Sequence, residues 1–192
     1  MKIEEYYDSV ASFWDDNYAE GRPARMIASA VSIPHGGACV LDIGCGNGSM
    51  FFDLLGNGAC EIEGLDLSSV MVETAKEKYG FDPRIHVERE DFFHHALAGY
   101  DVLMAFNSYH HFHHPREFLK KAKELLRAGG RLTVAFSFER EHMNTISSLL
   151  PPGLARGILP AEEEVFFWQE LFNVDCLCDN NSLYLISGTA KE

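Results

Sequence analysis

A glycine-rich turn preceded by an acidic residue is the part of this sequence best suited to chemistry. The turn runs from Gly44 to Gly48, and Asp42 stands two residues before it. Glycine lets a backbone bend sharply and approach a ligand closely, because no Cβ intervenes. The residues before the turn, Val40, Leu41 and Ile43, are typical of a strand buried on both faces of a parallel sheet. The pattern predicts a nucleotide-like ligand at the carboxyl end of a first strand.

A second acid narrows the choice of ligand. Asp66 ends a predicted second strand, 22 residues after Gly44, where a carboxylate can accept both hydroxyls of a ribose. The dinucleotide fingerprint, Gly-x-Gly-x-x-Gly, has no acid in the strand just before it, whereas here Asp42 precedes glycines at 44, 46 and 48. An anionic pyrophosphate is disfavoured beside Asp42, and an amine or sulfonium is favoured. A nicotinamide-dependent oxidoreductase is therefore the weaker alternative.

Strands and helices must alternate to position these residues. Alternation of this kind predicts an α/β fold with a parallel sheet and right-handed crossovers. The last third differs, because 139–160 is expected to be irregular and the chain then forms a helix and an antiparallel hairpin. The predicted strands are 39–43, 61–66, 84–89, 100–106, 131–138, 173–178 and 182–190, and the helices of the core are 47–55, 68–78, 115–128 and 162–172.

The first residues predict an amphipathic helix over 3–19 with an aromatic face, followed by a short helix over 24–31. One interpretation is a helix docked on the core. The other is a lid over the ligand, with Tyr6 or Tyr18 touching it. The aromatic residues Phe13, Trp14 and Tyr18 would suit a flat or apolar acceptor, although core packing explains them equally well.

Composition limits the class of protein. A chain of 192 residues with 46% apolar residues is typical of one globular domain. The sequence has no run of about 18 apolar residues, so no membrane-spanning helix is predicted. Its first residues also lack the pattern of a signal peptide. Five scattered cysteines fit reduced thiols, so we expect a cytoplasmic protein, monomeric or homodimeric. The net charge of −13 argues against nucleic acid as a partner and fits a small molecule better.

The motifs in their order resemble the class I S-adenosylmethionine-dependent methyltransferases, in particular small single-domain members close to the ubiquinone and menaquinone methyltransferase group. The resemblance covers the chain from Cys39 to Glu192. It implies a Rossmann-like sheet of seven strands, mostly parallel with an antiparallel last strand, and helices on both faces. The motifs that carry it are Val40 to Gly48, Gly64 to Ser68, Glu90 to Phe92, Asp101 to His111 and Leu125 to Leu132.

The resemblance also implies a role for each matching residue toward S-adenosylmethionine. It divides a single domain into an N-terminal helical lid (1–37), a cofactor-binding half (38–138), and a substrate-side segment with the C-terminal hairpin (139–192). The expected contacts are Gly44, Cys45 and Gly46 under the methionine part, Asp42 supporting that turn, Asp66 on the ribose, Leu67, Asp91 and Phe92 around the adenine, Asn107 near the methionine end, and Tyr18 in the lid.

The implied function is methyl transfer to a small-molecule acceptor by in-line displacement. A sulfonium already makes its methyl group electrophilic, so the protein must mainly align the acceptor and exclude water. His110 and His111 follow the fourth strand and are the candidates for a base, though a polar loop is the simpler interpretation. The histidines lack acidic or cysteine partners at metal-site spacing, so we expect no metal. His94 and His95 are expected to be solvated, and a noncatalytic cofactor-binding module remains an alternative.

Overall fold

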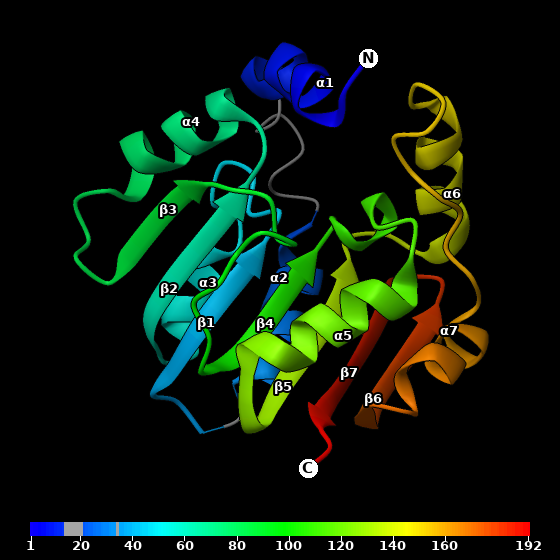
Figure 1. The fold of residues 1–192 in the computed structure, drawn as a ribbon. Coiled ribbons are helices and arrows are strands. Elements are labelled where there is room, and N and C mark those ends of the chain that lie inside the picture. The colour runs from blue at the N-terminus through cyan, green and yellow to red at the C-terminus, as the bar shows by residue number, and fades with distance from the viewer. Residues whose placement is uncertain (14–20, 34) are drawn as a thin grey trace.

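The computed structural model describes residues 1–13, 21–33 and 35–192, and the predicted contact residue Tyr18 lies outside these ranges. The described chain forms one seven-stranded sheet in the order β3-β2-β1-β4-β5-β7-β6. All neighbouring strands are parallel except the two pairs that involve β7. The predicted mostly parallel sheet with an antiparallel last strand is confirmed (Figure 1). The strands are β1 (Ala38–Ile43), β2 (Ala59–Asp66), β3 (Ile85–Arg89), β4 (Tyr100–Phe106), β5 (Leu126–Phe136), β6 (Phe172–Asn180) and β7 (Leu183–Ala190).

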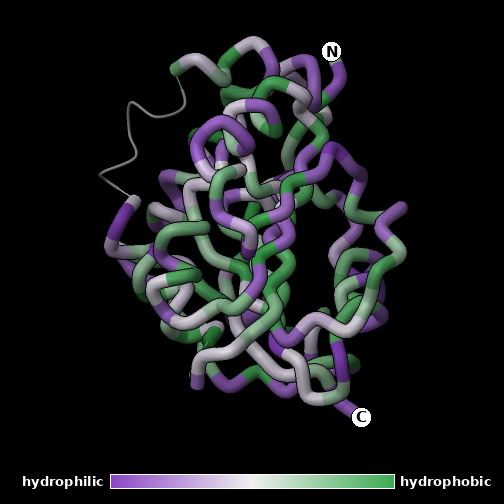
Figure 2. The backbone as a smooth tube through the Cα atoms, turned by 90° about the vertical axis from the view of Figure 1, so that its left-hand side faces the viewer, coloured by the Kyte–Doolittle hydropathy of each residue, from purple (hydrophilic) through white to green (hydrophobic). Residues whose placement is uncertain are grey.

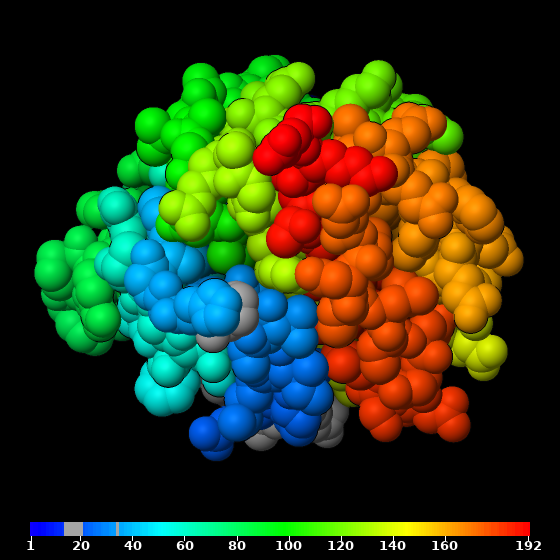
Figure 3. Space-filling view, turned by 90° about the horizontal axis from the view of Figure 1, so that it is seen from below, coloured from blue at the N-terminus to red at the C-terminus, as the bar shows by residue number. Residues whose placement is uncertain are grey.

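Helices cover both faces of the sheet, as expected. One hydrophobic core joins the sheet to α5 (Pro115–Leu125) and α7 (Ala161–Trp168). The other joins it to α2 (Arg22–Ser32), α3 (Phe51–Gly56) and α4 (Ser69–Tyr79). Seen from below, the red C-terminal residues lie between those near 125–130 and those near 170, which agrees with β7 between β5 and β6 (Figure 3).

The start of the chain lies at the end of the sheet where the parallel strands terminate. Helix α1 (Ile3–Val10) sits above the carboxyl ends of β1 and β2, and the C-terminal residues lie at the far end of the molecule (Figures 1 and 2). No described helix has the length and apolar character to cross a membrane. The carboxyl edge of the sheet is thus enclosed between α1, α4 and the loops that follow the strands.

Three expectations about local structure are wrong. Helix α1 ends at Val10, although the sequence predicts a helix over 3–19, whose residues 14–19 lie outside the described ranges. Residues 140–149 form a helix, α6 (Arg140–Leu149), where an irregular segment was predicted. Its apolar side chains Met143 and Ile146 are three residues apart, which is a helical spacing, but the pattern covers too few residues to identify a helix from the sequence. Strand β5 begins at Leu126, not at residue 131, because Leu126 already pairs with Tyr100 of β4 and ends α5 early.

Candidate active site

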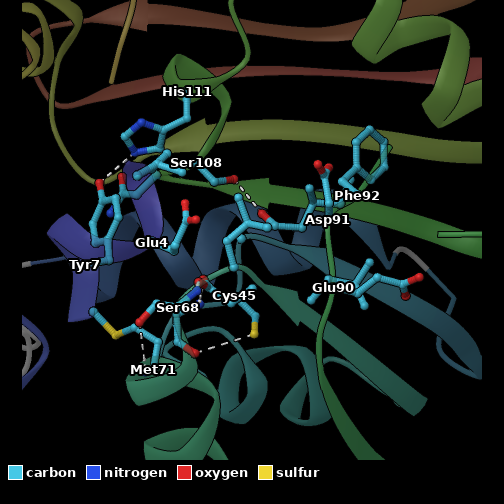
Figure 4. Close-up of a pocket in the computed structure, with 18 of the residues that line it drawn as sticks. Glu4, Tyr7, Cys45, Ser68, Met71, Glu90, Asp91, Phe92, Ser108 and His111 are labelled. Atoms are coloured by element: carbon cyan, nitrogen blue, oxygen red, sulfur yellow. Dashed lines mark hydrogen bonds between the residues drawn. The ribbon is translucent and has the colours of Figure 1, made fainter. Parts of the chain in front are cut away.

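A cavity of about 240 Å³ lies at the carboxyl ends of β1, β2 and β4, beneath α1 (Figure 4). Most residues expected to bind a cofactor line it, although they come from four separate segments. The structure therefore brings together Gly44, Cys45, Gly46, Asp66, Leu67, Asp91, Phe92 and Asn107. Residues that were not predicted also line it, among them Glu4, Tyr7, Ser68, Met71, Glu90 and Ser108.

The glycine turn lies flat against its neighbours. The backbone N–H groups of Gly44 and Cys45 donate to the carbonyl of Leu65, at 2.8 and 2.9 Å. Gly44 has φ +69°, and a Cβ built on it would lie 2.6 Å from the Cβ of Ser108. Ser108 in turn donates from Oγ to the carbonyl of Ile43 at 2.6 Å. The close packing explains why glycine is required here and leaves the cavity floor to backbone atoms.

Asp66 connects the glycine turn to the start of α4. Its Oδ2 accepts from the N–H of Gly46 and its Oδ1 from the N–H of Ser68, both at 2.8 Å. Burial raises the pKa of Asp66, while the backbone hydrogen bonds act to lower it. The carboxylate thus lines the cavity with its orientation fixed, as a group that receives ribose hydroxyls must be.

Asp42 does not line the cavity but lies beneath the turn, with 1% of its surface exposed. Its Oδ2 has no hydrogen-bond partner among the described residues. Burial, and secondarily the charge of Asp66, raises the pKa of Asp42 to about 8. A buried acid of this kind is ionised more easily when a cation binds nearby. The two carboxyl groups, Asp66 in the cavity wall and Asp42 beneath the turn, therefore fit a ligand with an ammonium or sulfonium group.

The wall on the other side follows β3. Phe92 is buried against Phe112 and Phe118, with ring centroids 5.6 and 5.1 Å away. Asp91 accepts from the N–H of Phe93 through Oδ1 at 2.9 Å, so part of its carboxylate already holds the turn. Figure 4 shows Asp91 and Phe92 facing Tyr7 across the cavity.

Helix α1 is attached on both sides of the cavity. On one side Asp8 Oδ1 accepts from Ser68 Oγ at 2.6 Å and from the N–H of Val70 at 3.2 Å. On the other side the Tyr7 hydroxyl lies 2.6 Å from Nε2 of His111 (Figure 4). The aromatic face predicted for this helix is therefore turned toward the cavity, at least at Tyr7.

Both ring nitrogens of His111 are engaged by the protein. Nδ1 lies 2.6 Å from the carbonyl oxygen of Leu154, which can only accept, so Nδ1 carries the proton. Burial lowers the pKa of His111 to about 4, so the ring is neutral near pH 7. Nε2 is then the acceptor for the Tyr7 hydroxyl. His111 lines the cavity, but it holds α1 in place.

A second cavity of about 270 Å³ adjoins the first and shares Tyr7, Ser49, Phe106 and Asn107 with it. His110 lines this second cavity, with 3% of its surface exposed and Nδ1 lacking a partner among the described residues. Burial, followed by the neighbouring His111, holds the pKa of His110 well below its usual range. The opposite wall is apolar and comes mainly from the end of β5 and from α6: Phe138, Met143, Ile146 and Leu150.

Asn107 stands at the border between the cavities in a left-handed backbone conformation, φ +54°. Its Oδ1 accepts from the N–H of Ser137 at 2.8 Å, and its Nδ2 donates to Ser137 Oγ at 2.9 Å. Non-glycine residues rarely adopt this conformation except where surrounding contacts hold it, often at functional sites. The ends of β4 and β5 are thereby fixed together where the two cavities meet.

Within residues 1–13, 21–33 and 35–192, no group of three or more histidine, cysteine, aspartate or glutamate residues is arranged to hold a metal ion.

Known proteins share this architecture. A family described as a methyltransferase domain matches residues 41–132. The ubiquinone biosynthesis O-methyltransferase of Paraburkholderia phytofirmans is 27% identical over 182 residues, which cover 84% of this chain and 78% of that protein. The tRNA U34 carboxymethyltransferase of Vibrio cholerae is 32% identical over 101 residues, 48% of this chain but only 30% of that protein.

A solved structure extends the likeness to the whole chain. The N-methyltransferase NodS of Bradyrhizobium japonicum, in complex with S-adenosylhomocysteine, superposes with a TM-score of 0.79 at 14% identity and covers 100% of both chains. At that identity the likeness concerns the fold. The glycine turn and the acids described above lie within the family match, and together these findings support a class I S-adenosylmethionine-dependent methyltransferase.

Proposed function

We propose that the protein moves a methyl group from S-adenosylmethionine in the first cavity to a small-molecule acceptor in the second. The observation that carries this proposal is the border the cavities share, at Tyr7, Ser49, Phe106 and Asn107. When bound, the cofactor supplies an electrophilic methyl group. The chain's own task is to hold the donor and acceptor in line and to keep water out.

The proposal assigns residues to the cofactor as the resemblance implies, and the place of most of them in the first cavity supports it. Asp66 receives the ribose hydroxyls, and the turn from Gly44 to Gly46 passes under the methionine part, with Asp42 below it balancing positive charge. Leu67, Asp91 and Phe92 enclose the adenine, and Asn107 lies at the methionine end. Helix α1, held by Tyr7 and Asp8, closes the top of the cavity and limits the entry of water.

Of the two histidines expected to serve as a base, we assign acceptor contact to His110. Both nitrogens of His111 are used to hold α1 and to bind the Leu154 carbonyl. His110 lines the second cavity and keeps Nδ1 without a partner in the described chain. Its low pKa keeps the ring neutral, so it can accept a hydrogen bond or a proton from an acceptor that has one to lose.

The relatives support a small acceptor more than a nucleic acid. The ubiquinone-biosynthesis relative matches 84% of the chain, whereas the tRNA-modifying relative matches 48%. The net charge of −13 also disfavours a phosphate backbone. A cytoplasmic location and a monomeric or homodimeric state remain predictions from composition.

Calorimetric titration with S-adenosylmethionine, S-adenosylhomocysteine and NAD tests the cofactor assignment. Both sulfur ligands should bind and NAD should not. Replacing Asp66 with Ala should weaken binding by about 1–3 kcal/mol if the carboxylate holds the ribose. Unchanged affinity in that variant would show that Asp66 does not contact the ligand.

A pair of variants on α6 tests the acceptor cavity. Ile146→Arg places a charged chain in the second cavity and should abolish methyl transfer to small acceptors while leaving S-adenosylhomocysteine affinity unchanged. Leu149→Arg, at an 80% exposed position of the same helix, should change neither property. Full transfer by Ile146→Arg, or methylation of tRNA but of no small molecule in an acceptor screen, would overturn the proposal.

A further inference from the structure

A chain of four polar side chains links β2 and β4 to the segment that follows β3, beside the first cavity. Glu90 Oε2 lies 2.7 Å from His95 Nδ1, and His95 Nε2 lies 2.9 Å from the Tyr100 hydroxyl. The Tyr100 hydroxyl also donates to Glu63 Oε2 of β2. His95 is 4% exposed and Tyr100 is 2% exposed, which corrects the expectation that His95 is solvated. A buried network of this kind is costly unless every member is satisfied.

Counting hydrogens shows that this network must hold one extra proton. If the carboxylates of Glu90 and Glu63 are both ionised, His95 must donate to Glu90 through Nδ1–H. The Tyr100 hydroxyl has one hydrogen, and it donates that hydrogen to Glu63. The third contact, His95 Nε2 to the Tyr100 oxygen, would then join two lone pairs unless a further proton is present. That proton sits on the His95 ring, which then donates from both nitrogens. Otherwise it sits on Glu90, which donates to Nδ1 while Nε2 carries the ring proton, or on Glu63 with the Tyr100 hydrogen bond reversed toward His95.

The surroundings favour retention of that proton. The cluster contains two carboxylates, and Nε2 of His95 is also only 3.9 Å from Glu63 Oε1. Burial, together with the bond to Glu63, raises the pKa of Tyr100, so the phenol stays protonated. Lys121 of α5 also contacts this region, and its Nζ donates to the His95 carbonyl oxygen at 2.5 Å. Glu61 and Cys39 also face Tyr100 and add to the negative character of the region.

The network controls the position of the wall described above. Glu90 lines the first cavity, and its N–H donates to the carbonyl of Asp66 at 3.1 Å. The N–H of His95 donates to the Asp91 carbonyl at 3.2 Å and closes the turn that carries Phe92. His95 therefore fixes both ends of the segment that encloses one side of the cavity, without touching the cavity itself.

We propose that His95 is a positioning residue whose buried, proton-holding network with Glu90, Tyr100 and Glu63 keeps the cofactor wall in its binding geometry. Cofactor affinity then falls as the pH rises and the network loses its proton. Once that proton has been released, the loss of affinity approaches tenfold per pH unit, because binding is linked to one proton. The proposal relies on the first cavity being the cofactor site.

Glu63→Gln is the decisive variant, because the amide supplies the extra hydrogen permanently. It can donate to the Tyr100 oxygen, which frees the Tyr100 proton for a neutral His95. We measure S-adenosylhomocysteine affinity by calorimetry from pH 6 to 9.5. Glu63→Gln should match the wild type at low pH and lose its pH dependence, so that it binds roughly threefold or more tightly than the wild type at high pH. Glu61→Gln is the matched control, because it removes the same charge from the same strand at a 54% exposed side chain that makes no hydrogen bond to Tyr100, and affinity in this variant should still fall as the pH rises.

Two further readouts separate a positioning role from a general structural one. The ¹⁵N chemical shifts of the His95 ring should show protonation changing over the same pH range as affinity. His95→Gln should weaken S-adenosylhomocysteine binding at every pH in this range, and its affinity should not change with pH. Identical pH profiles in the wild type and Glu63→Gln would overturn the network proposal, whereas absence of S-adenosylhomocysteine binding at every pH would overturn the cofactor site instead.

Discussion

Removal of the Glu164 carboxylate should strongly destabilise the protein. Glu164 lies on α7 with no exposed surface, and its Oε1 accepts from Arg156 Nη2 at 2.8 Å and from the Tyr109 hydroxyl at 2.7 Å. The Arg156 guanidinium also lies 4.7 Å from the centre of the Tyr109 ring. Breaking a buried ion pair by deleting one partner typically costs about 3–5 kcal/mol, since the other charge stays buried without compensation.

We therefore expect Glu164→Ala to lower the free energy of unfolding by about 3–5 kcal/mol in urea denaturation. Glu163→Ala is the control, because Glu163 is an exposed neighbour on the same helix, and it should change stability by about 0.5 kcal/mol or less. If Glu164→Ala does not fold, Glu164→Gln keeps an oxygen acceptor and should give an intermediate loss. A Glu164→Ala value within about 1 kcal/mol of the control would refute the reasoning.

The same substitution should also affect the second cavity. The Arg156 N–H donates to the His110 carbonyl at 2.8 Å, and Arg156 Nε donates to the Phe112 carbonyl at 2.9 Å. Loss of Glu164 releases the guanidinium and so loosens the loop that carries His110. Methyl transfer by the folded variant should fall more than its affinity for S-adenosylhomocysteine.

Two other predictions concern the first cavity. Asp42 binds its proton more tightly in the folded protein, with a pKa of about 8 against an ordinary 3.8, so wild-type stability should fall as pH rises between these values. Asp42→Asn should remove this pH dependence and make the protein about 1–3 kcal/mol more stable at pH 8, as measured by thermal or urea unfolding. The variant should bind S-adenosylmethionine less tightly than the wild type. An unchanged dependence of stability on pH would contradict the assignment. Tyr7→Phe removes the bond to His111, worth about 1 kcal/mol, and should speed amide hydrogen exchange in α1. Tyr6→Phe, on the same helix, should exchange like the wild type, and equal rates in both variants would count against Tyr7 as the attachment.

Local chemistry made much of the fold predictable. Strand β4 has the predicted bounds, because an uninterrupted apolar run is typical of a central parallel strand. Pro115 begins α5, and Ser68 caps α4 by accepting from the Met71 N–H, as their residue types favour. The cofactor side was predictable for the same reason, since its residues follow successive strands that end at one edge.

Contacts between distant residues were not predictable in this way. His111 meets Tyr7 across 104 positions and Leu154 across 43, so nothing local showed that both of its nitrogens are engaged. His95 looks like a solvated residue beside His94, and only the fold brings Glu63 and Tyr100 to it. The second cavity depends on α6, whose apolar period was too brief to stand out from the surrounding irregular segment.

The position of β7 has a consequence for synthesis of the protein. This strand is inserted between β5 and β6, and its residues are almost all buried. Until Leu183–Ala190 has left the ribosome, β5 and β6 cannot join, and each has a backbone edge without its β7 partner. Such edges recruit other strands, and pairing across long sequence separations is slow. This part of the nascent chain is therefore most prone to aggregate just before β7 emerges, and chaperone binding should matter most at that stage.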